Sequence, residues 1–153
     1  MKLYLIRHGD AVSAQVDPER PLSKKGRDET AAVAAFMKKS RVVVNEIWHS
    51  KKLRAKQTAE IVSEAIEFDE VLEINGLSPN DPVIDMLDEI YEAEEDLVIV
   101  GHLPFLAKLF AQLLINDEAC EIVDFKASAA VCLNHNPDIG WEISWMVSPE
   151  ILK

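Results

Sequence analysis

The sequence predicts an α/β fold, in which helices cover both faces of a mostly parallel central sheet. Short apolar runs recur along the chain, and the clearest, residues 97–100, is continuous and mostly β-branched. Such runs are typical of strands that are covered on both faces. Between them, other segments repeat apolar residues at the spacing of one helical face. Strands that alternate with helices in this way favour a doubly wound, three-layer architecture.

The composition predicts one ordinary globular domain over residues 1–153. Hydrophobic residues make up 48% of the chain and charged residues 28%, which argues against a disordered protein. No apolar run approaches the ~20 residues that are needed to span a bilayer. The first predicted strand starts at residue 2, which leaves no room for a signal peptide. We therefore expect a cytoplasmic protein without a membrane partner.

The net charge of −11 narrows the choice of partners. Nucleic-acid binding is driven by basic patches, so no nucleic-acid partner is expected. On so acidic a chain, a pocket that gathers cations is a stronger functional candidate than the same residues on a basic surface.

The two cysteines indicate neither a metal site nor a disulfide. Cys120 and Cys132 form no metal-ligand pattern, and both lie in apolar surroundings in the sequence. We therefore expect two buried, reduced thiols, as is usual in the cytoplasm.

The first predicted strand, residues 3–6, ends directly at Arg7, His8 and Gly9. Glycine lets the chain turn sharply there because it has no Cβ atom. The arginine and the histidine are therefore placed at the carboxyl end of a strand, where open α/β sheets bind their ligands.

The next element is a helix that follows a polar connection. Residues 17–21 are rich in turn formers, and Ser23 has the properties of a helix N-cap. Gly26 is expected to weaken the first turn slightly. The predicted inner face of this helix consists of small and apolar residues, namely Thr30, Val33, Ala34 and Met37.

A second strand, residues 46–49, is followed by Ser50, which we expect to cap the next helix. Arg54 falls in the first turn of that helix, near the positive end of its dipole, where a cation is unfavourable. This local conflict points to a functional role for the arginine. The inner face is predicted to contain Ala55, Thr58, Ala59, Val62, Ala65 and Ile66.

Four further segments complete the outer parts of the fold. Residues 71–74 predict an edge strand, and residues 83–92 have helical spacing. Residues 129–133 and 142–147 flank a turn, so a terminal antiparallel hairpin is expected.

The central strand at residues 97–100, like the first strand, is an apolar run with a glycine and a histidine close after it. It ends in Gly101 and His102, and a helix that is apolar nearly all round follows, over residues 105–114. His102 thus lies between a strand and a helix N-terminus, where free backbone N–H groups favour anions.

Three strand ends therefore carry polar side chains: Arg7 with His8, Ser50 with Arg54 just beyond, and His102. The carboxyl ends of parallel strands lie along one edge of a sheet, so these side chains can converge. The guanidinium group offers a planar fork of donors that matches phosphate. Two arginines and two histidines around one phosphoryl group predict a phosphotransfer site.

The motifs resemble those of the histidine phosphatase superfamily, the phosphoglycerate-mutase-like proteins. Arg-His-Gly at residues 7–9 is similar to the first family motif, residues 50–58 to the second and Gly-His at residues 101–102 to the third. The resemblance spans residues 1 to about 115 in the correct order. It implies the phosphoglycerate-mutase-like α/β fold.

Within the superfamily, the chain is most similar to the SixA-type phosphohistidine phosphatases. The similarity rests on the short length, on Arg-His-Gly-Asp-Ala at residues 7–11 and on His-Leu-Pro at residues 102–104. It implies a signalling role, in which phosphate is removed from a phosphorylated histidine phosphotransfer protein.

The resemblance also implies the roles of the site residues. His8 would be the nucleophile that becomes phosphohistidine and then yields to water. The attacking ring is neutral, so an acceptor should hold its Nδ1–H and leave Nε2 free. Arg7, Arg54 and His102 would bind the phosphoryl oxygens, with a smaller contribution from Ser50. No metal or other cofactor is implied, because the arginines supply the positive charge.

One departure from the family concerns the proton donor. Larger members carry a mid-chain glutamate as general acid, and residues 73–79 of this chain offer no clear equivalent. Asp10 and Glu73 are the possible proton donors, although each also suits a structural or solvated role. An alkoxide leaving group needs such a proton more than an imidazole does, so the departure favours phosphohistidine as substrate.

Three alternatives remain open from the sequence. The first is a small-molecule phosphomonoesterase of the same superfamily, and the second is a module that binds a phosphoprotein without turnover. The third is a metallohydrolase that uses His8, Asp10 and His102, although the adjacent arginines would repel a dication.

Overall fold

The computed structural model describes residues 1–153. Its centre is a six-stranded mixed sheet with the strand order β3-β2-β4-β1-β5-β6. The strands from β3 to β1 run parallel, whereas β5 runs antiparallel to β1 and β6 antiparallel to β5. The bounds are β1 Lys2–Arg7, β2 Glu46–His49, β3 Glu70–Glu73, β4 Leu97–Gly101, β5 Ala130–Asn136 and β6 Gly140–Val147.

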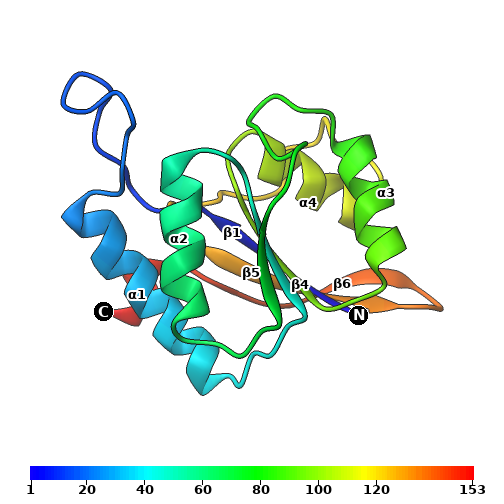
Figure 1. Cartoon of the computed structure of the whole chain (residues 1–153). Helices are drawn as coiled ribbons and strands as arrows, with labels where there is room; N and C mark the ends of the chain where they lie inside the picture. Colours follow the sequence, from blue (N-terminus) through cyan, green and yellow to red (C-terminus); the bar gives the residue numbers. More distant parts are fainter.

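Four helices cover the two faces of this sheet. Figure 1 shows α1 and α2 on one side and α3 and α4 on the other, which confirms the predicted three-layer α/β architecture. No helix combines the length and the apolar character needed to cross a bilayer. The bounds are α1 Lys24–Lys39, α2 Leu53–Ser63, α3 Val83–Ala93 and α4 Phe105–Ile115, and the 3-10 helix η1 (Pro149–Leu152) follows β6.

Each helical layer encloses its own apolar core against the sheet. Along β1, Leu3 and Leu5 pack into the core under α3 and α4, whereas Tyr4 and Ile6 pack into the core under α1 and α2. This alternation follows from the pleat of the strand. The neighbouring strand β4 is buried at every residue, which explains its continuous apolar sequence.

Most of the predicted elements are confirmed. The edge strand β3 and the terminal hairpin β5–β6 are present. Ser23 caps α1, since its hydroxyl oxygen accepts a hydrogen bond from the Gly26 N–H at 3.0 Å. The predicted inner faces are buried in α1 (Thr30, Val33, Ala34, Met37) and in α2 (Ala55, Thr58, Ala59, Val62). The prediction was wrong for Ala65 and Ile66, which lie beyond the end of α2 at Ser63.

The prediction that Ser50 caps α2 is wrong. The helix begins at Leu53, and the N-cap position is occupied by Lys52. Three residues separate the end of β2 at His49 from the start of the helix, so the Ser50 hydroxyl lies too early to cap. It instead accepts a hydrogen bond from the Lys52 N–H at 3.3 Å and lies 2.6 Å from Nε2 of His102.

The expectation of two buried thiols holds for only one cysteine. Cys132 lies on the inner strand β5 and is buried, whereas Cys120 is exposed, and both are free thiols. Cys120 follows α4 in a segment without helix or strand, where no packed face covers it. An apolar sequence neighbourhood alone therefore did not predict its burial.

Gly26 has a steric role that its sequence position did not reveal. A Cβ atom built on Gly26 would lie 2.0 Å from the carbonyl oxygen of Asp10. A Cβ atom on Gly9 would likewise lie 2.7 Å from Oγ1 of Thr30. The first turns of α1 therefore pack directly on the backbone that follows β1, and these two glycines make that close approach possible.

We predict that Gly26→Ala destabilises the protein by about 1–3 kcal/mol through overpacking. Helix propensity alone predicts the opposite sign, a gain of about 1 kcal/mol. Urea denaturation measures the free energy of unfolding. The matched control is Ala35→Gly on the exposed face of α1, which should cost about 1 kcal/mol from propensity alone. A Gly26→Ala variant as stable as the wild type would contradict the packing described here.

Candidate active site

The structure brings the predicted strand ends together at one edge of the sheet. Arg7 pairs with Gly101 across β1 and β4, and His49 pairs with Val100 across β2 and β4. The residues that follow these strands are therefore neighbours. The backbone N–H of His8 donates to the Gly101 carbonyl at 3.0 Å.

The His8 ring is held in one tautomer. Its Nδ1 lies 2.7 Å from the Gly9 carbonyl oxygen, and a carbonyl can only accept, so Nδ1 carries the proton. Nε2 has no hydrogen-bond partner in the protein. Burial, together with the charges of Arg54 and Arg7, lowers the pKa of His8 to about 4, against the opposing effect of the Gly9 bond. At neutral pH the ring is therefore uncharged, with Nε2 free.

His102 packs beside His8, with 4.9 Å between the ring centroids. The ring is 1% exposed, and its Nε2 lies 2.6 Å from Oγ of Ser50. Burial, and then the positive charges of the neighbouring groups including Arg54 and Lys52, lowers the pKa of His102 to about 3. The second imidazole is thus also neutral at physiological pH.

The two arginines approach from different elements. Arg7 ends β1, and one of its terminal nitrogens donates to the Phe125 carbonyl at 2.8 Å. Arg54 lies in the first turn of α2. Burial lowers the pKa of both guanidinium groups.

Thr58 ties the helix that carries Arg54 to the loop that carries His8. Its hydroxyl donates to the Arg54 carbonyl at 2.8 Å and accepts the Gly9 N–H at 3.0 Å. The side chain is fully buried. The Thr58 hydroxyl therefore links the two parts of the site directly.

Three buried nitrogen atoms in this region lack any hydrogen-bond partner. They are Nε of Arg7, Nε of Arg54 and Nδ1 of His102, and no other buried side-chain nitrogen or oxygen in the protein shares this property. Buried polar groups are nearly always paired, so each exception needs an explanation. All three belong to residues that the sequence singled out, and together they can bind an anion.

Arg20 is a further cation at the site that sequence reasoning missed. It lies in the connection before α1 with a φ angle of +49°, a strained value for a residue other than glycine. Its Nε donates to the Val12 carbonyl at 3.1 Å. Its charge lowers the pKa values of His8, Arg54 and His102. Nothing in the sequence distinguished this arginine from a solvated loop residue.

The two possible proton donors lie apart from the histidines. The Asp10 carboxylate accepts the Ser23 hydroxyl at 2.6 Å and lines a separate cavity of about 200 Å³ beside Lys25 and Lys126. Glu73 is exposed at the end of the edge strand β3, where it pairs with His49, and its carboxylate forms no hydrogen bond or ion pair. Neither carboxylate contacts His8. The protein contains no group of three or more His, Cys, Asp or Glu side chains arranged to hold a metal ion.

Comparison with known proteins identifies the family. Residues 3–78 match the model of the histidine phosphatase superfamily (branch 1). The chain is 30% identical over 161 residues to the phosphohistidine phosphatase SixA of Escherichia coli (strain K12), covering 100% of this chain and 97% of that protein. The chain belongs to the histidine phosphatase superfamily, and the resemblance seen in the motifs is confirmed.

Solved structures agree with this result. The protein histidine phosphatase SixA complexed with tungstate superposes with a TM-score of 0.87 at 27% identity, over 100% of both chains. The α-ribazole phosphatase from Shigella flexneri has a TM-score of 0.76 at 18% identity, over 97% of each chain, and shares the fold alone. Together with the family, the SixA relatives support a phosphatase, a class of hydrolase.

We predict that the two neutral histidines make the protein less stable in mild acid. Both folded pKa values lie below the unfolded value of 6.5. At a pH between the folded and the unfolded pKa of a histidine, the unfolded chain binds more protons than the folded protein, so the free energy of unfolding decreases as pH falls. Between pH 7 and pH 5 each histidine should contribute a loss of about 2 kcal/mol.

Urea denaturation of wild type and His8→Asn, in phosphate-free buffer at pH 7 and pH 5, measures this contribution. The variant should lose about 2 kcal/mol less than the wild type on acidification. Equal losses would show that His8 takes up its proton at an ordinary pH in the folded protein.

Proposed function

We propose that this protein is a metal-independent phosphohistidine phosphatase of the cytoplasm. Its proposed substrate is the phosphohistidine of a signalling histidine phosphotransfer protein. The relatives named above support the substrate class, since SixA of Escherichia coli is a phosphohistidine phosphatase. Tungstate, which is bound in a SixA structure, is a tetrahedral oxyanion like phosphate.

The observation that carries the proposal is the set of three unpartnered nitrogens beside His8. Nε of Arg7, Nε of Arg54 and Nδ1 of His102 are buried without a protein acceptor. An unpaired buried donor costs about 1–3 kcal/mol, which a bound anion would recover. A phosphoryl group has three oxygens that can accept these donors while His8 faces its phosphorus.

In the first step, the lone pair on Nε2 of His8 attacks phosphorus. The phosphorus–nitrogen bond of the substrate breaks, and its electron pair stays on the substrate imidazole. If the other ring nitrogen of the substrate already carries a proton, the imidazole leaves neutral and no proton is needed in this step. His8 keeps its Nδ1 proton, which the Gly9 carbonyl accepts in a hydrogen bond, so the phosphorylated ring is cationic.

In the second step, water attacks the phosphorus of the His8 phosphohistidine. The phosphorus–Nε2 bond breaks, its electron pair returns to Nε2, and one water proton passes to solvent as inorganic phosphate leaves. The cationic ring is a good leaving group because it departs as a neutral imidazole. The pKa of His8, about 4 in the free enzyme, then keeps the imidazole neutral for the next catalytic cycle.

Ser50 fixes the tautomer of His102 in this proposal. The Ser50 oxygen accepts the Lys52 N–H, which leaves its own hydroxyl proton free to donate to Nε2 of His102. The His102 proton then lies on Nδ1, where it can donate to a phosphoryl oxygen. The opposite tautomer would present a lone pair to the anion.

The missing general acid supports phosphohistidine over a sugar phosphate. An imidazole has a pKa near 6.5, so its nitrogen leaves without the protonation that an alkoxide requires. Neither Asp10 nor Glu73 contacts His8. As a leaving-group proton donor, each therefore stays a secondary hypothesis.

The decisive assay follows phosphate release from a phosphorylated histidine phosphotransfer domain, compared with glucose 6-phosphate. We predict that wild type prefers the phosphoprotein and that EDTA leaves the rate unchanged. His8→Ala should lose at least about 10³-fold in kcat. The matched control is His135→Ala, because His135 packs against Trp141 outside the site, and this variant should retain activity.

Each alternative has its own outcome in this assay. Equal phosphate release by wild type and His8→Ala would refute the nucleophile assignment. Faster release from the sugar phosphate would favour a small-molecule phosphomonoesterase, and binding of the phosphoprotein without release would favour a recognition module. Loss of activity in EDTA that added metal restores would refute metal independence.

A further inference from the structure

A second group of cations lies beside the phosphate site. Arg20, Lys51, Lys52 and Arg54 line a cavity of about 520 Å³, and Glu19 is the one carboxylate in its lining. Arg54 belongs both to this cavity and to the candidate active site. The cavity therefore continues the phosphate site along the protein surface.

These four cations form no ion pair within the protein. The three ion pairs of the chain join Lys24 to Asp28, Lys25 to Glu29 and Lys126 to Asp124, all of them outside this cavity. The chain has 27 acidic residues and a net charge of −11. Four cations without an internal partner on so acidic a protein create a local positive potential that attracts an anionic partner.

The two lysines also lie at an unfavourable end of a helix. Lys52 is the N-cap of α2, Lys51 precedes it, and the first turn of the helix contains no acidic residue. The N-terminus carries the positive end of the helix dipole, so these charges do not stabilise α2. In α1, by contrast, Lys38 and Lys39 lie in the last turn, where the dipole favours them. A charge that opposes local stability points to a role outside the helix.

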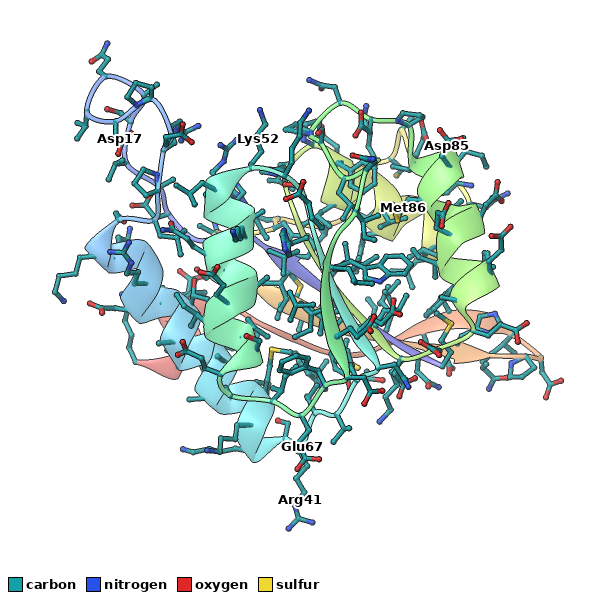
Figure 2. The ribbon with its side chains drawn as sticks, viewed as in Figure 1. Asp17, Arg41, Lys52, Glu67, Asp85 and Met86 are labelled. Carbon is teal, nitrogen blue, oxygen red and sulfur yellow. The ribbon has the colours of Figure 1, made fainter.

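Two elements that are distant in the sequence form the walls of the cavity. Figure 2 shows Lys52 at the start of α2, on the side where the segment that carries Asp17 projects from the molecule. Pro18 and Arg20 of that segment line the facing wall. The hydrogen bond from Nε of Arg20 to the Val12 carbonyl anchors its side chain at 3.1 Å.

We propose that Lys51 and Lys52 bind carboxylate side chains that flank the phosphohistidine of a protein substrate. This inference rests on the proposed function and adds the chemistry of the partner surface. Only Pro18 and Leu53 in the lining are uncharged, so the cavity suits a polar occupant. The net charge of the chain repels an acidic partner, whereas these cations attract its carboxylates beside the phosphate site, which orients its phosphohistidine toward His8. Charges at the rim of an interface act in this way on association rate and specificity.

The test compares Lys51→Gln/Lys52→Gln with the control Lys38→Gln/Lys39→Gln, which removes the same charge from the C-terminal end of α1. The substrates are a phosphorylated histidine phosphotransfer domain with Asp or Glu beside its phosphohistidine, the same domain with those residues changed to Asn or Gln, and phosphoramidate. The ratio of kcat/KM on the acidic domain to kcat/KM on phosphoramidate should be about 3- to 10-fold lower in the Lys51/Lys52 variant than in the wild type. The control should stay within about twofold of wild type, as expected for charges far from an interface.

A double-mutant cycle gives the sharper result. Neutralising the substrate carboxylates should lower kcat/KM of the wild type by a similar factor but should not lower that of the Lys51/Lys52 variant further. Thermal unfolding should show that this variant is at least as stable as the wild type, because a charge is removed from the positive helix end.

Two outcomes would overturn the inference while leaving the proposed function intact. One is an equal loss on phosphoramidate and on the acidic domain, which would mean that the lysines act on the phosphoryl group itself. The other is that the wild type is active and prefers the acidic domain over the neutralised one, and that the Lys51/Lys52 variant keeps the same preference. A wild type that releases no phosphate from either domain would refute the proposed function, and with it this inference.

Discussion

Three side-chain nitrogens, on Arg7, Arg54 and His102, are held in the protein interior without a hydrogen-bond partner. Leaving a buried donor unpaired costs about 1–3 kcal/mol, so the rest of the fold has to offset this cost. Two apolar cores, one on each face of the sheet, hold the strand ends in place. The Thr58 hydroxyl then joins the loop after β1 to the first turn of α2. In the proposed function, an anion would therefore meet a site whose side chains are already held in place.

The same arrangement determines the protonation of the two histidines. Burial and the nearby guanidinium groups lower the pKa values of His8 and His102 to about 4 and about 3. The groups that can bind a phosphoryl group therefore also keep the neighbouring imidazoles neutral. For His8, the Gly9 carbonyl selects the tautomer in which Nε2 is free. In the proposed mechanism, the same positive charges would therefore both bind the phosphoryl group and keep the His8 nucleophile neutral.

The sequence was sufficient for the features that depend on strand ends. An apolar run followed by Arg7 and His8, and another followed by His102, predicted both the parallel strands and their shared edge, because parallel strands end on one side. It could not predict features that arise from contacts between distant segments. Arg20 reaches the site from a loop, and Gly26 is required because Asp10 passes beside α1. Ser50 bonds His102, which is distant in the sequence, instead of capping α2. A local sequence pattern cannot predict such contacts.

The central claim is that one oxyanion satisfies all three unpartnered donors in front of His8. A crystal structure of the protein with tungstate tests it most directly. We expect one tungstate ion whose oxygens lie about 3 Å from Nε of Arg7, Nε of Arg54 and Nδ1 of His102, with Nε2 of His8 facing the tungsten atom. Tungstate bound elsewhere, or bound with either arginine turned away from it, would contradict the claim.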